Sequence, residues 1–181
     1  RRFWNRNVVA IGLSAGFLEP LESTSIYLIQ EGISRFISLF PDSTLSDVLR
    51  EEYNRHMKTE FEQVRDFIIL HFKATKRDDS PFWDYCRNMT IPDSLTHKID
   101  LFRHGGRAFR YEDELFSRSS WVAVFLGQNI APDSCDPVIA SLPANEVMAS
   151  VESMRTAIEQ ATRQMPTHEE ILKRYRKVGA A

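Results

Sequence analysis

A short segment near the start of the chain concentrates side chains that could do chemistry. Glu19 and Glu22 flank Pro20 within an otherwise apolar stretch, and Ser23-Thr24-Ser25 follow at once. A carboxylate held close to apolar surface tends to have a functional role or a specific partner. Hydroxyl residues at the start of a helix coincide with free backbone N–H groups and the positive end of the helix dipole, which suit an anion. An ordinary connection, with Ser23 or Thr24 as a helix cap, is the alternative.

The elements around this segment position it. Residues 7–12 form a β-branched run closed by Gly12, which predicts a buried strand. Small residues and Pro20 then predict a turn, and the apolar spacing from Ile26 to Phe40 predicts a helix. Because a lone buried strand cannot satisfy its backbone groups, we expect its sheet partners upstream of Arg1, in a longer protein.

The rest of the chain reads as helical. Apolar residues at steps of three and four predict a helix from about Asp42–Thr44 to Lys73, and shorter helices are predicted over 83–87, 94–102 and 116–129. The stripe from Val147 to Met165 predicts another helix, which we interpret as packed on its own domain. Residues 166–170 have capping-box chemistry before a last helix, so the end should be a helical hairpin.

Composition excludes several function classes. With 181 residues, 43% of them hydrophobic, the chain fits one domain with a sizeable core. A net charge of −2 lacks the broad basic field of a nucleic-acid-binding protein. The apolar runs are too short to cross a membrane. Two distant cysteines and five histidines without a His-x-x-x-His pair predict no disulfide framework and no metal site, and a reducing cytoplasm is the simplest compartment.

Two stretches resemble a known family. Residues 7–24 read NVVAIGLSAGFLEPLEST, and residues 66–72 and 77–83 read DFIILHF and RDDSPFW. Both are similar to the flavin-dependent halogenases, the tryptophan halogenase family. The resemblance covers nearly the whole chain and implies a mainly α fragment: the C-terminal helical part, plus one strand, of a larger α/β (α+β) FAD-dependent monooxygenase-like fold. Residues 1–26 would end the flavin-binding region with the halide loop, and 27–181 would form a helical substrate-side region continuous with it.

The resemblance also implies a reaction and its participants. In this family reduced FAD and oxygen give a flavin hydroperoxide, which oxidises chloride or bromide to hypohalous acid. That acid halogenates an aromatic substrate, here an indole or tryptophan-like molecule. The implied partners are the upstream flavin domain of the same protein and a separate flavin reductase. The family's Gly-x-Gly-x-x-Gly turn, its Trp-x-Trp-x-Ile-Pro motif and its tunnel lysine all belong upstream, so we expect these 181 residues alone to be inactive.

The site residues follow from the same resemblance. Glu22 falls on the family's active-site glutamate, beside the substrate. Thr24 and Ser25 fall on the two positions whose backbone N–H groups hold the halide, and Leu13 and Ile26 fall on positions that contact the flavin. Position 25 is commonly Gly in the family. Because its contact is through N–H, halide binding should survive a serine whose backbone dihedrals suit a Cβ.

The residues that would bind the substrate are assigned less specifically than the halide and flavin residues. Phe116 and Trp121 could flank an aromatic ring, and core packing on a helix is the alternative reading. Two other functions also stay open: a flavin monooxygenase relative that does not halogenate, and a non-catalytic helical binding module.

Overall fold

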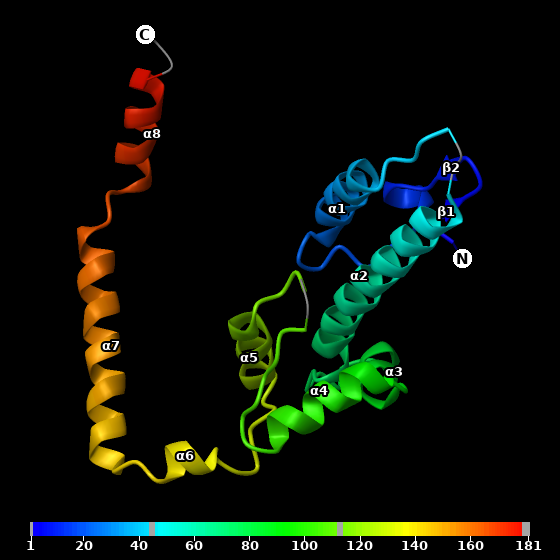
Figure 1. The fold of residues 1–181 in the computed structure, drawn as a ribbon. Coiled ribbons are helices and arrows are strands. Elements are labelled where there is room, and N and C mark those ends of the chain that lie inside the picture. Colours follow the sequence, from blue (N-terminus) through cyan, green and yellow to red (C-terminus); the bar gives the residue numbers. More distant parts are fainter. Residues whose placement is uncertain (1, 44–45, 112–113, 179–181) are drawn as a thin grey trace. The chain divides into compact units, whose positions relative to one another are not determined.

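The computed structural model describes residues 2–43, 46–111 and 114–178. It divides the chain into two compact units, residues 1–135 and 136–181. These units are defined by how the chain packs. The boundary predicted after residue 26 separates a flavin and halide region from a substrate side, and it stays a prediction. Helices dominate both units, as the sequence predicts, and a two-stranded sheet is formed at the N-terminus (Figure 1).

The N-terminal strand has its partner within the chain, so the expectation of partners only upstream was wrong. β1 (Trp4–Asn5) pairs antiparallel with β2 (Val8–Val9), with Trp4 opposite Val9. Arg6, at φ 54°, lies in the left-handed region that lets the chain reverse between the strands. Asn54 binds the far side of the hairpin: its Oδ1 accepts from the Trp4 N–H at 2.9 Å, and its Nδ2 donates to the Trp4 carbonyl at 2.8 Å. A side-chain amide thus satisfies backbone groups that a further strand would otherwise pair.

Two long helices form the frame of the first unit. The short 3-10 helix η1 (Gly12–Ser14) leads through an irregular segment into α1 (Thr24–Ser38), and α2 (Asp47–Lys73) follows. Both long helices confirm the predicted periodicity. α1 packs alongside α2 (Figure 1) through a buried cluster of Leu28, Val64 and Ile68. Gly12, at φ +67°, allows η1 to lie against α1, where a Cβ would meet Ile29 Cγ1 at 3.3 Å.

Three shorter helices pack around the C-terminal half of α2. They are α3 (Pro81–Asn88), α4 (Asp93–Arg103) and α5 (Arg118–Gly127), close to the predicted ranges. Together with α2 they enclose the main apolar core, made of Phe67, Leu70, Leu95, Ile99, Phe102, Ala108, Trp121, Phe125 and Ile130. This core contains large aromatic rings and excludes solvent at its centre, where Leu70 and Leu95 are fully buried.

The second unit contains α6 (Pro137–Ala140), α7 (Ala144–Gln164) and α8 (His168–Val178). The capping box is confirmed: Thr167 N–H donates to Glu170 Oε2 at 2.7 Å, and Glu170 N–H donates to Thr167 Oγ1 at 3.3 Å. The predicted hairpin was wrong, and the second unit by itself does not bury the 147–165 stripe, because every side chain from Met148 to Glu170 is exposed. Periodicity identifies the apolar face of a helix but not what covers it. Within the described ranges, no helix has both the length and the apolarity needed to cross a membrane.

Candidate active site

The turn before α1 has an unusual backbone. Glu22 and Ser23 have φ values of 64° and 54°, in the left-handed region that non-glycine residues rarely adopt and that recurs at functional sites. The Ser23 N–H donates to the Pro20 carbonyl at 2.9 Å, which closes the turn. Ser23 occupies the N-cap position without a side-chain cap hydrogen bond, so the simple capping alternative is wrong for this residue.

The first two residues of α1 present free donors. Among the described residues, no backbone carbonyl accepts from the N–H of Thr24 or Ser25, as expected for the first turn of a helix. Thr24 is 1% exposed, and its Oγ1 has no hydrogen-bond partner in the described part of the chain. Ser25 lies in the helix and is absent from the positive-φ positions, so its Cβ is accommodated without strain. Two N–H groups and the helix dipole therefore provide the arrangement that an anion needs.

Glu22 faces a histidine that sequence reasoning missed. Glu22 Oε1 lies 3.6 Å from Nε2 of His71, in the last turn of α2. His71 Nδ1 lies 2.8 Å from the Phe67 carbonyl, and this contact requires the proton on Nδ1 because a carbonyl can only accept. The ring is thereby oriented with Nε2 toward the carboxylate, whose side chain is 43% exposed. The sequence contained one indication that His71 belongs to the site, because His71 lies in residues 66–72, which resemble the family.

An aromatic cluster connects this pair to the predicted substrate side. The Phe67 ring meets the His71 ring edge-on at 4.9 Å, stacks on Phe116 at 3.7 Å, and meets Trp121 edge-on at 4.9 Å. The structure thus brings Phe116 and Trp121 together around Phe67. Trp121 is 1% exposed and belongs to the main core, and Phe116 packs against that core. This is the packing role that the sequence left open, and a ring-flanking role stays a prediction.

Leu13 lies in η1 and Ile26 lies in the first turn of α1. Their side chains are 76% and 66% exposed, which leaves them available for contact with a further group. Leu13 and Ser25 also line a small cavity of about 20 Å³ between η1 and α1. That volume is enough for one water-sized species.

Comparison with known proteins identifies the family. The family model described as tryptophan halogenase matches residues 1–144. The chain belongs to the tryptophan halogenase family. The chain is similar to Xcc4156, a flavin-dependent halogenase from Xanthomonas campestris, with 45% identity and a TM-score of 0.91 over 96% of this chain and 35% of that one. It is also similar to BrvH, a flavin-dependent halogenase from Brevundimonas sp. BAL3, with 42% identity and a TM-score of 0.89 over 95% of this chain and 35% of that one.

A curated relative points the same way. The tryptophan 7-halogenase RebH of Lentzea aerocolonigenes is 33% identical, and the match covers 91% of this chain and 34% of that protein. This member of the tryptophan halogenase family therefore spans about a third of the length of the relatives it matches. The mainly helical fold of the fragment is confirmed by the two solved structures.

Proposed function

We propose that this chain is the C-terminal part of a flavin-dependent halogenase that oxidises chloride or bromide and halogenates an indole- or tryptophan-like substrate. The observation that carries the proposal is the pairing of a half-exposed carboxylate, Glu22, with two free N–H groups at the start of α1, those of Thr24 and Ser25. The names of the relatives, flavin-dependent and tryptophan halogenases, support the same reaction.

The residues present fit a flavin. Leu13 and Ile26 expose apolar side chains, and the buried hydroxyl of Thr24 has no hydrogen-bond partner among the described residues. Reduced FAD, when bound, would activate O2, and O2 would supply the two-electron oxidation that converts the halide into an electrophile. Leu13 and Ile26 would contact it, and the N–H groups of Thr24 and Ser25 would hold the halide nearby. The flavin-binding domain upstream in the same protein and a separate reductase that delivers reduced flavin complete this proposal.

Glu22 performs the proton chemistry in this proposal. When a halogen adds to an aromatic carbon, that carbon must lose its proton for the ring to regain aromaticity. A carboxylate oxygen of Glu22 takes this proton as general base. His71 is a positioning residue, because its Nε2 faces Glu22 while its Nδ1–H is anchored on the Phe67 carbonyl. The aromatic rings of Phe116 and Trp121 would lie on the substrate side.

The test uses the natural protein with reduced flavin, a halide and tryptophan or indole. Glu22→Gln keeps the side-chain volume and removes the base, so halogenated product measured by mass spectrometry should fall by about 100-fold or more. Glu19→Gln, an exposed carboxylate in the same segment, is the matched control and should retain activity. His71→Asn should lower kcat while leaving the KM for halide unchanged. Unchanged product formation by Glu22→Gln would contradict the catalytic role and favour a binding module.

A halide titration separates the remaining alternative. In a halogenase, aromatic product formation depends on halide concentration and saturates as the N–H site fills. A flavin monooxygenase relative would oxidise its substrate at a rate independent of halide, and that result would reject halogenation.

A further inference from the structure

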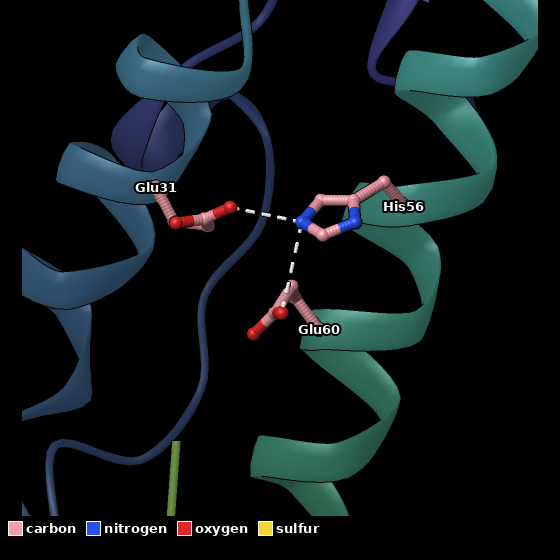
Figure 2. Close-up of side chains that lie close together, drawn as sticks. All are labelled: Glu31, His56 and Glu60. Carbon is pink, nitrogen blue, oxygen red and sulfur yellow. Dashed lines mark hydrogen bonds and ion pairs between the residues drawn. The ribbon is translucent and has the colours of Figure 1, made fainter. Parts of the chain in front are cut away.

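A second cluster of chemically capable side chains lies between α1 and α2, at a different part of their contact. It consists of Glu31 from α1 and of His56 and Glu60, one turn apart on α2. Figure 2 shows His56 Nε2 pointing between the two carboxylates. Nε2 lies 2.9 Å from Glu31 Oε1 and 3.7 Å from Glu60 Oε1, and the three ligand atoms all lie within 4.8 Å of one another.

Neighbouring side chains hold both carboxylates in place. The Tyr27 hydroxyl donates to Glu60 Oε2 at 2.8 Å, which leaves Oε1 directed toward His56. Arg35 Nη2 donates to Glu31 Oε1 at 3.0 Å. Such outer hydrogen bonds are what orients carboxylate ligands in established metal sites.

The cluster is short of positive charge. Glu60 is 3% exposed, and its burial raises the pKa of its carboxyl, partly offset by the Tyr27 hydrogen bond and by His56. Glu31 and Glu60 together carry two negative charges when ionised, and the Arg35 guanidinium balances one. A bound cation would balance the remaining charge of the two carboxylates.

We propose that Glu31, His56 and Glu60 bind a divalent transition-metal ion of the Zn²⁺ type. Tetrahedral bonds of about 2.0–2.2 Å place ligand atoms roughly 3.4 Å apart, and the observed separations of 2.9 and 3.7 Å from Nε2 lie on either side of that value. One imidazole nitrogen and two carboxylates are a ligand set that zinc accepts. A cavity of about 290 Å³, lined in part by His56, Thr59 and Glu60, gives room for a water as fourth ligand.

This site departs from the expectation of no metal. That expectation rested on the absence of a His-x-x-x-His pair, whereas the cluster combines His-x-x-x-Glu on one helix with a glutamate from another. A bound ion would fasten α1 to α2, and α1 carries the two N–H donors at its start. The metal proposal does not depend on the halogenation reaction, because its test measures the amount of bound metal and not the formation of product.

The experiment measures Zn²⁺ bound by the natural protein after treatment with a chelator and dialysis against Zn²⁺. Elemental analysis should give one Zn²⁺ per chain, with the affinity taken from competition with a chromophoric chelator. Glu60→Gln can still accept the Tyr27 hydrogen bond, and His56→Gln can still donate to Glu31. Each should weaken Zn²⁺ binding by at least about 100-fold. Glu62→Gln, on the same helix with a half-exposed side chain, is the matched control and should bind as the wild type does.

Two further readouts sharpen the test. Co²⁺ substituted for Zn²⁺ should give the visible absorption of a tetrahedral site, and the affinity for Zn²⁺ should fall as the pH is lowered because protons compete with the metal for its ligand atoms. Absence of stoichiometric Zn²⁺, or equal binding by the wild type and the two ligand variants, would overturn the proposal.

Discussion

Replacing Lys98 by methionine should destabilise the first unit strongly. Lys98 on α4 is 9% exposed and Glu114 is 2% exposed. The Lys98 ammonium lies 2.8 Å from Glu114 Oε1 and donates to Glu114 Oε2 and to the Phe109 carbonyl, each at 3.1 Å. It also lies 4.4 Å from the ring centroids of both Tyr111 and Trp121. Methionine keeps most of the side-chain volume but supplies none of this charge.

The magnitude follows from which charge is left behind. Lys98→Met leaves the Glu114 carboxylate buried without a cation, which costs about 3–5 kcal/mol of unfolding free energy. Glu114→Gln costs less, about 1–3 kcal/mol, because the ammonium keeps the Phe109 carbonyl and two aromatic rings. The double variant contains no uncompensated charge, so its cost should be below the sum of the two by about 2 kcal/mol.

The assay is urea unfolding of the natural protein followed by tryptophan fluorescence, because Trp121 is itself part of the cluster. Lys58→Met is the matched control: Lys58 Nζ lies 3.8 Å from Glu62 Oε1, with side chains 71% and 46% exposed. This surface pair should contribute below about 0.5 kcal/mol. A Lys98→Met variant within about 1 kcal/mol of the wild type, or a coupling energy near zero, would refute the assignment of a buried, mutually dependent pair.

Three further predictions concern other parts of the first unit. Gly12→Ala should lower the free energy of urea unfolding by about 1–2 kcal/mol, because it puts a Cβ at φ +67° and 3.3 Å from Ile29. Gly127→Ala is the control: its Cβ would lie in open space on α5, so it should be neutral or stabilising by up to about 1 kcal/mol. In chelator-treated protein, burial raises the pKa of Glu60, so as pH rises above about 4.5 the wild type should lose melting temperature relative to Glu60→Gln; a constant difference across the pH range would contradict this. Ser25→Ala should leave the halide KM within about threefold, because the proposed contact is the N–H; a large rise would implicate the hydroxyl.

The sequence alone was sufficient for the helices. α1, α2 and α7 each carry apolar residues at steps of three and four over several turns, and this local pattern reports which face is apolar. The long stretch at residues 7–24 was also sufficient for the family, which the match over residues 1–144 confirms. Both signals are contained within short segments of chain, so no knowledge of distant contacts was required.

Contacts between distant segments were decided only by the tertiary structure. The backbone N–H and carbonyl of Trp4 are satisfied by Asn54, and Glu22 meets His71, although neither pairing leaves a local pattern. The same holds for Glu31 with His56, and for the exposed stripe of α7, whose periodicity is equally compatible with burial. Periodicity is a property of one helix, whereas a partner depends on how two helices pack. That packing brings together side chains whose separation in sequence carries no information about their distance in space.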